Sequence, residues 1–107
     1  MSDLADRKCK TPKKTDLPVA PELASKMITK LPGWKMDPKS LTRTYSFENY
    51  YQTMAFVNAV AWIAHQEDHH PDLTVGYNKC DIRYSTHAVG GLSENDFICA
   101  AKVNRLI

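Results

Sequence analysis

The sequence lacks the long apolar runs and the cysteine pairs that indicate membrane or secreted proteins. No apolar stretch approaches the ~20 residues of a membrane-spanning helix, and no apolar signal segment follows Met1. The 3 cysteines are odd in number, widely spaced and without a CxxC pair, which indicates reduced thiols rather than a disulfide framework. We therefore expect a soluble, cytoplasmic protein, with a nuclear pool as the alternative.

The chain also lacks a strong charge of either sign. Its net charge of +2 at pH 7 is too small to favour direct nucleic-acid binding. Basic residues cluster only near the N-terminus, among polar residues without apolar periodicity, so residues 1–18 are predicted to form a flexible, solvated arm. A chain of 107 residues can bury one core but not two, and we expect residues 19–107 to form a single domain.

The common signatures of nucleophilic and nucleotide-dependent enzymes are missing as well. The sequence has no GxSxG motif, no cysteine nucleophile motif, no GxGxxG fingerprint and no Walker-type loop. Gly90-Gly91 alone indicates a tight connection rather than a phosphate site. The chemistry that remains is general acid–base catalysis by histidine, without a metal or redox cofactor.

Apolar periodicity predicts alternating helices and hairpins. In chain order these are a helix over 21–31, a hairpin of 34–36 with 41–47, a helix over about 48–68, a hairpin of 73–77 with 80–85, and a last helix after the N-cap Ser93. Two hairpins make a four-stranded antiparallel sheet whose apolar face needs cover. We therefore expect an α+β two-layer sandwich, with three helices covering one face of the sheet.

The long helix carries two apolar surfaces. One broad face suits packing on the sheet, while Tyr51, Ala55, Ala59 and Trp62 form a second strip on roughly the opposite side. A surface helix of a monomer has little use for such a strip, which favours a contact between subunits. The alternative is that another helix of the same chain covers it.

Three histidines are the most informative feature of the chain. A two-residue turn at Asn78-Lys79 would pair Tyr77 with Cys80, Val75 with Ile82 and Leu73 with Tyr84. This register brings His70 level with His87 at the open end of the hairpin, beside His69. A longer turn would shift the register but keep the histidines at that end. An imidazole cluster of this kind suits proton transfer.

A metal site is the competing interpretation of the histidines. His65 and His69 stand at i and i+4 on the predicted helix, a spacing that zinc ligands use, and His70 or His87 would add a third ligand. However, Glu67 does not complete an HExxH motif, and adjacent His69 and His70 can hardly bind one ion together. We therefore expect no metal.

The motifs around these histidines resemble a known family. The chain from about residue 23 onward is similar to pterin-4a-carbinolamine dehydratases, in the segments Glu67-Asp68-His69-His70-Pro71-Asp72, Val75-Gly76-Tyr77-Asn78-Lys79, Ser85-Thr86-His87 and Gly91-Leu92-Ser93-Glu94-Asn95-Asp96-Phe97, with Pro32-Gly33-Trp34 upstream. The resemblance implies dehydration of 4a-hydroxytetrahydropterin to the quinonoid dihydropterin, in tetrahydrobiopterin recycling. The family forms two-layer α+β dimers or tetramers and uses no cofactor, since the pterin is the substrate.

The resemblance also implies a set of site residues. The catalytic residues would be His69, His70 and His87. The residues along the bound pterin would be Asp68, His69, His70, Ser85, Thr86, His87 and Ala88, with Asp96 orienting the site. Many family members carry an acidic residue where this chain has His65, so no role of that carboxylate is transferred here.

A binding role is the second class of function that the resemblance implies. Relatives act as dimerisation cofactors of a homeodomain transcription factor, and some family-like proteins are assembly factors. The apolar strip around Trp62 would suit a protein partner. Retention of all three histidines favours an enzyme, because a scaffold has no physical need for them.

Overall fold

The computed structural model describes residues 4–13 and 15–107. Its main elements, in chain order, are α1 (Pro21–Ile28), β1 (Lys35–Met36), β2 (Leu41–Ser46), α2 (Tyr50–Glu67), β3 (Asp72–Val75), β4 (Lys79–Tyr84) and α3 (Glu94–Asn104). Two short 3-10 turns, η1 (Leu4–Asp6) and η2 (His87–Val89), precede α1 and follow β4. The element order matches the order predicted from the sequence, with helix ends that shift by a few residues.

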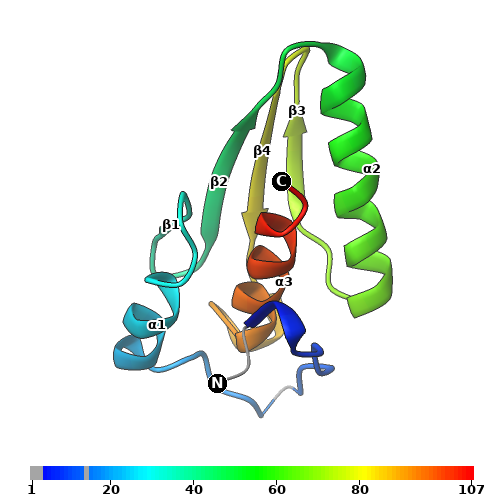
Figure 1. The fold of residues 1–107 in the computed structure, drawn as a ribbon. Helices are drawn as coiled ribbons and strands as arrows, with labels where there is room; N and C mark the ends of the chain where they lie inside the picture. The colour runs from blue at the N-terminus through cyan, green and yellow to red at the C-terminus, as the bar shows by residue number, and fades with distance from the viewer. Residues whose placement is uncertain (1–3, 14) are drawn as a thin grey trace.

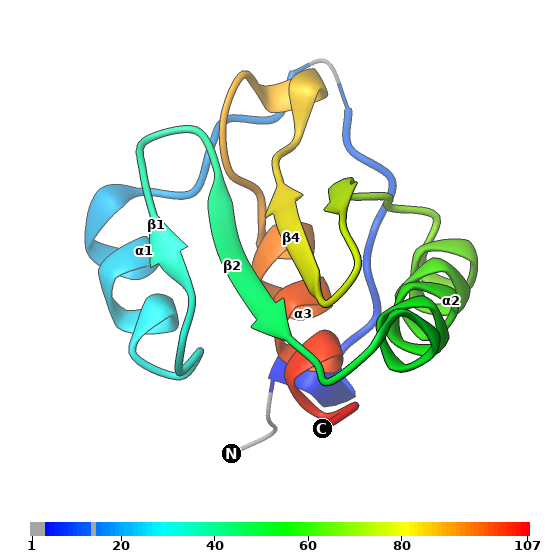
Figure 2. The ribbon, with the colours of Figure 1, turned by 90° about the horizontal axis from the view of Figure 1, so that it is seen from above.

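The four strands form one antiparallel sheet in the order β1-β2-β4-β3. Figures 1 and 2 show the helices on one side of this sheet, with α3 in front of its centre in the view of Figure 1 and α2 beyond β3. Both α2 and α3 contact the sheet and each other. The predicted α+β fold, with a helical layer on a four-stranded antiparallel sheet, is therefore confirmed.

Strict alternation along β4 creates the core. Cys80, Ile82 and Tyr84 are fully or almost fully buried, while the residues between them are exposed. On the helical side, Phe97 and Val103 of α3 are fully buried against this face. Burial of this kind supplies most of the stabilisation of a small domain.

The observed register between β3 and β4 differs from the predicted one. Leu73 pairs with Ile82 and Val75 with Cys80, two positions away from the expected partners. The turn is centred one residue earlier than predicted, on Tyr77-Asn78, with the Gly76 N–H donating to the Lys79 carbonyl. There the carbonyl of Asn78 accepts from the Phe47 N–H, and the carbonyl of Tyr77 accepts from the Thr53 hydroxyl. A shift of two keeps every side chain on its predicted face.

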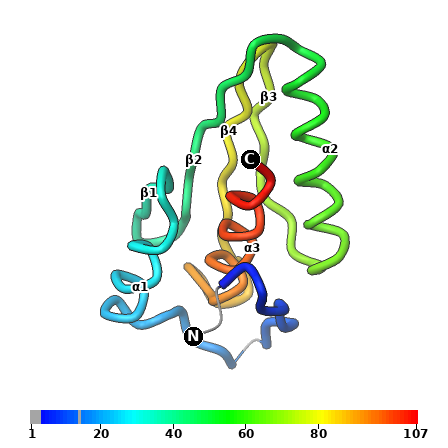
Figure 3. Tube along the Cα trace, in the orientation of Figure 1, coloured from blue at the N-terminus to red at the C-terminus, as the bar shows by residue number. Residues whose placement is uncertain are grey.

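The N-terminal segment is not solvated throughout. Leu4 and Ala5 are buried, and η1 packs on α3. Farther along, the Cys9 N–H donates to Glu67, and Asn95 bonds both the N–H and the carbonyl of Lys10. Figure 3 follows this segment past the lower end of α3. Sequence patterning missed the contacts of Cys9 and Lys10 because they come from single polar groups rather than from an apolar period. Its residues 1–3 and 14 lie outside the described part, and the division at residue 18 stays a prediction.

The second apolar strip of α2 is exposed within this chain. Tyr51 and Trp62 are 83% and 59% exposed, whereas Phe56, Val60 and Ile63 on the other side are buried. No helix among the described residues covers Tyr51 or Trp62, so the alternative of cover by another helix of the same chain is wrong. The described helices also include none with the length and apolarity of a membrane span.

Candidate functional site

A pocket of about 240 Å³ lies where α2, β4 and the loop before α3 meet. We call it the histidine pocket. Its lining includes all the site residues expected from the sequence except Asp96, namely Asp68, His69, His70, Ser85, Thr86, His87 and Ala88. The pocket is smaller than the ~300–1,000 Å³ of drug-sized ligand sites. It suits a ligand of the size of a small bicyclic ring.

The end of α2 directs the two adjacent histidines to different surroundings. The helix ends at Glu67, and Asp68 adopts the left-handed conformation with φ 50°. This cap breaks the helix, and Pro71 then disfavours helical geometry at His70. As a result the His69 side chain is only 10% exposed, whereas His70 is exposed to solvent.

A buried carboxylate holds His69. Oδ1 of Asp96 lies 2.7 Å from Nε2 of His69, while Oδ2 accepts from the Thr86 hydroxyl at 2.8 Å and from the Ser93 N–H at 2.9 Å. Asp96 is fully buried. The His69 ring also stacks on Tyr84, with centroids 5.8 Å apart and planes 12° apart. Because Nε2 faces the carboxylate, Nδ1 is the nitrogen of His69 that remains for a ligand.

His70 and His87 join the pocket lining from two different segments of the chain. His70 comes from the loop after α2, with Nδ1 3.4 Å from the Pro71 carbonyl, so its Nε2 is the freer nitrogen. His87 begins η2, after β4. Both side chains are exposed and able to face a ligand. His69, His70 and His87 all line this one pocket.

The structure adds three pocket residues that sequence reasoning missed. Asp72 and Arg83, a directly opposed pair on β3 and β4, line the pocket on the outward side of the sheet. Their place on the exposed, polar face of the hairpin was the available signal. Pro12 lines the pocket from the N-terminal segment, which no local sequence pattern could indicate.

His65 lies apart from the pocket. It is exposed on α2, and its ring packs against Trp62 at 5.4 Å between centroids. It does not line the histidine pocket. Across residues 4–13 and 15–107, no three His, Cys, Asp or Glu side chains are grouped closely enough to hold a metal ion.

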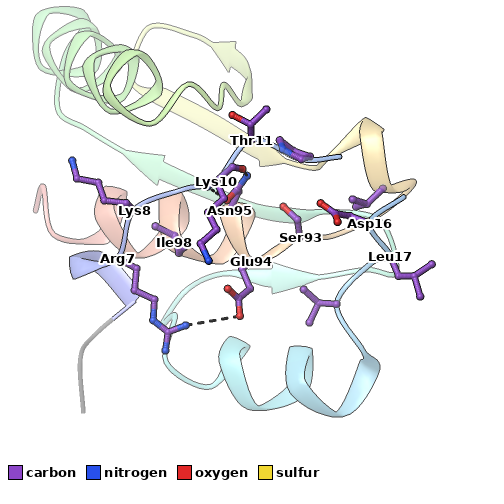
Figure 4. Close-up of a pocket in the computed structure, with 13 residues that line it drawn as sticks. Arg7, Lys8, Lys10, Thr11, Asp16, Leu17, Ser93, Glu94, Asn95 and Ile98 are labelled. Atoms are coloured by element: carbon purple, nitrogen blue, oxygen red, sulfur yellow. Dashed lines mark hydrogen bonds and ion pairs between the residues drawn. The ribbon is translucent and has the colours of Figure 1, made fainter. Parts of the chain in front are cut away.

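A larger hollow of about 570 Å³ lies on the other side of the N-terminal segment (Figure 4). Pro12 lines both cavities. The larger one is bounded by the segment itself and by the start of α3, where Arg7 and Glu94 form an ion pair at 4.0 Å. It contains no histidine, so it offers less proton-transfer chemistry than the histidine pocket.

Tyr84 carries a buried polar group that lacks a hydrogen bond in the described part of the chain. Its hydroxyl is buried and has no hydrogen-bond partner among residues 4–13 and 15–107. Burial, together with the nearby Cys99 and Cys9, raises the pKa of Tyr84 well above its ordinary value. The ring therefore acts as an apolar platform beneath His69 and not as a proton donor.

Sequence comparisons agree with the motif analysis. A family model described as Pterin 4 alpha carbinolamine dehydratase matches residues 18–106. A protein of Nitrosomonas eutropha named for pterin-4-alpha-carbinolamine dehydratase is 60% identical over 106 residues, covering 98% of this chain and 94% of its own. A protein of the same name from Nitrosospira multiformis is 57% identical, covering 99% and 94%.

Structural comparisons give the same fold. A transcriptional coactivator/pterin dehydratase from Brucella melitensis superposes with a TM-score of 0.79 at 26% identity, covering 83% of this chain and 97% of its own. A pterin dehydratase-like protein described as a RuBisCO assembly factor in the alpha-carboxysome gives a TM-score of 0.57 at 26% identity, covering 68% and 84%.

Proposed function

Since this chain belongs to the pterin-4a-carbinolamine dehydratase family, a family of hydro-lyases, we propose that its histidine pocket dehydrates 4a-hydroxytetrahydropterin. The product is the quinonoid dihydropterin, and the role is the recycling of tetrahydrobiopterin used by aromatic amino-acid hydroxylases. The observation that carries the proposal is the lining of one small pocket by His69, His70 and His87.

The reaction needs two proton transfers. The hydroxyl on C4a must gain a proton to leave as water, and N5 must lose a proton as the double bond between C4a and N5 forms. A positioned imidazole on each side of the reacting atoms meets both needs, and each transfer contributes about 10²–10⁴-fold to the rate. Neither step requires a nucleophile, and the proposed mechanism uses no metal or cofactor.

The contacts of the three histidines support a division of roles. His70 and His87 carry the two proton transfers, because both are exposed in the pocket lining. His69, fixed by Asp96 and stacked on Tyr84, binds and orients the ring through Nδ1. Asp68, Ser85, Thr86 and Ala88 form the walls along the pterin.

Single histidine-to-alanine variants test this proposal. We expect His70→Ala and His87→Ala to lower kcat for dehydration by about 10²–10⁴-fold. His65→Ala is the matched control, because it removes an exposed imidazole outside the pocket and should leave kcat unchanged. Near-normal turnover in both pocket variants would rule out the proposed roles.

Treatment with a chelator tests the absence of a metal from the mechanism. We expect full activity after the treatment. If the untreated protein contains stoichiometric zinc and the chelator abolishes its activity, a metal mechanism would be favoured.

The exposed strip on α2 supports a second, compatible proposal. Tyr51 and Trp62 place two aromatic side chains on the solvent face of a helix, and such patches commonly mark protein contacts. We propose that this strip joins subunits of a homodimer or homotetramer. Sedimentation should show smaller assemblies for Trp62→Glu than for His65→Glu, a neighbouring charge substitution. If Trp62→Glu does not reduce the mass of the assembly, the strip does not join subunits and would instead contact a different protein partner.

A further inference from the structure

A second hollow of about 260 Å³ adjoins the histidine pocket. The two share Arg83, Ser85, Thr86 and His87, and the second extends to Lys39 and the Gly90-Gly91 turn. We propose that this second hollow, the basic hollow, binds an anionic substituent, a phosphate or a carboxylate, carried by the pterin. The inference rests on the proposed function, because it concerns a ligand whose ring occupies the histidine pocket.

The lining of the basic hollow is cationic. Lys39 and Arg83 carry full positive charges, and no carboxylate belongs to the described lining. Neither the Lys39 nor the Arg83 side chain has a hydrogen bond or ion pair within residues 4–13 and 15–107. Two charged groups with free donors therefore face the same recess. This arrangement favours an anionic ligand.

Asp37, a carboxylate that interacts electrostatically with Arg83, is already engaged in hydrogen bonds. Hydrogen bonds from the Ser40 hydroxyl and the Lys39 N–H, with a smaller effect of Arg83, hold the pKa of Asp37 below its ordinary value. Its oxygens accept from the Lys39 N–H, the Ser40 N–H and the Ser40 hydroxyl at 2.7–2.8 Å. Asp37 stabilises the turn between β1 and β2 and does not line the hollow. It leaves the Arg83 and Lys39 donors open to a ligand.

The two cavities differ in polarity in a way that matches a substituted pterin. Asp68 and Asp72 line the histidine pocket but not the basic hollow. Carboxylates suit the 2-amino and N3–H donors at one end of the ring. The substituent is carried on C6, which is bonded to the reacting atom N5. With N5 beside His87 on the shared wall, the substituent extends towards Lys39 and Arg83.

A pair of ligands that differ by one phosphate tests the inference. The dissociation constants of 7,8-dihydroneopterin and 7,8-dihydroneopterin 3′-monophosphate are measured by fluorescence titration of the intact protein at fixed ionic strength. We expect the phosphorylated ligand to bind about tenfold more tightly, as for one charge-assisted hydrogen bond. Arg83→Gln and Lys39→Gln should each reduce that ratio, and Lys39→Gln, whose residue lies outside the histidine pocket, should leave the affinity for the neutral ligand unchanged. Lys35→Gln, which removes the same charge from an exposed residue outside the basic hollow, should preserve the ratio.

The outcomes separate this inference from the proposed function. Equal affinities for the two ligands, or a ratio that Arg83→Gln and Lys39→Gln leave intact, would overturn the basic hollow as a substituent site. Inorganic phosphate should bind at least tenfold more weakly than the phosphorylated pterin. Equal binding would identify a site for free anions and would also overturn the inference. Failure of the native protein to bind either pterin would contradict the proposed function itself.

Discussion

Nε2 of His69 and Oδ1 of Asp96 lie 2.7 Å apart, although the residues are 27 positions apart in the chain. The contact joins the end of α2 to the first turn of α3. Because the carboxylate of Asp96 also accepts from Thr86 and Ser93, its orientation is fixed from three directions. Asp96 thereby fixes which nitrogen of His69 is presented to the pocket.

Asp96→Asn should change the tautomer of His69. The amide oxygen would keep the Ser93 N–H, and the amide NH₂ would then face Nε2, which must become an acceptor. We expect kcat for dehydration to fall about 10²-fold, because a misoriented group costs that much. Nitrogen chemical shifts of His69 should report the exchange of the hydrogen from Nε2 to Nδ1. A lower kcat with unchanged His69 shifts would indicate a structural role only.

Glu67 should stabilise the protein at neutral pH. Its side chain is 4% exposed, accepts the Cys9 N–H at 2.9 Å and lies 3.8 Å from the Lys102 ammonium. Glu67→Gln keeps an oxygen for Cys9 but removes the ion pairs, so the free energy of unfolding at pH 7 should fall by about 1 kcal/mol. Glu67→Ala also leaves the Cys9 N–H without its acceptor, so the free energy of unfolding should fall by about 1–3 kcal/mol more. Denaturant titrations measure both.

The loss of stability caused by Glu67→Gln should depend on pH. Burial alone would raise the pKa of Glu67, but the Cys9 N–H, Lys102 and Lys8 together outweigh it and hold the pKa below its ordinary value. A lowered folded-state pKa gives stability that is complete above the unfolded value of about 4.3 and is lost as the pH falls through the folded value. The difference between native protein and Glu67→Gln should therefore shrink in acid. A difference that grows below pH 4 would contradict this account.

Tyr84→Phe should not destabilise the protein. The buried hydroxyl finds no partner in the described part of the chain, so its removal avoids an uncompensated desolvation cost. The ring keeps its stacking on His69 and its contact with Trp34. We expect the free energy of unfolding to rise by about 1 kcal/mol. A loss of more than 1 kcal/mol would reveal a hydrogen bond to the hydroxyl.

Cys9 should be the reactive thiol of the folded protein. Cys80 and Cys99 are fully buried. Burial raises the pKa of Cys80, and a hydrogen bond with Cys9 together with burial raises the pKa of Cys99. Brief treatment with N-ethylmaleimide should therefore give one adduct on the Cys9 peptide, and three adducts after unfolding. One fast adduct that persists in Cys9→Ala would contradict the prediction.

The sequence predicts what depends on periodicity and on backbone restriction. Pro71 and the alternation along 80–84 determine that the double histidine leaves a helix and that β4 has one buried face. These features suffice to bring His70 and His87 to one end of the hairpin, even with the register wrong by two.

Tertiary contacts determine the features of the fold and of the pocket that the sequence does not predict. The turn at 76–79 is set by hydrogen bonds to Phe47 and Thr53, which local turn preferences do not contain. Pro12 reaches the pocket because Glu67 and Asn95 hold the segment before it. Such single polar contacts between distant residues leave no periodic signal, so a sequence alone does not reveal them.

The most direct test of the whole account is the rate of dehydration of 4a-hydroxytetrahydropterin, generated in situ by an aromatic amino-acid hydroxylase. We predict that the native protein accelerates formation of the quinonoid dihydropterin far above the spontaneous rate. The folded variant His69→Ala/His70→Ala/His87→Ala should return it to that spontaneous rate. Equal acceleration by the native protein and the triple variant would contradict histidine catalysis in this pocket.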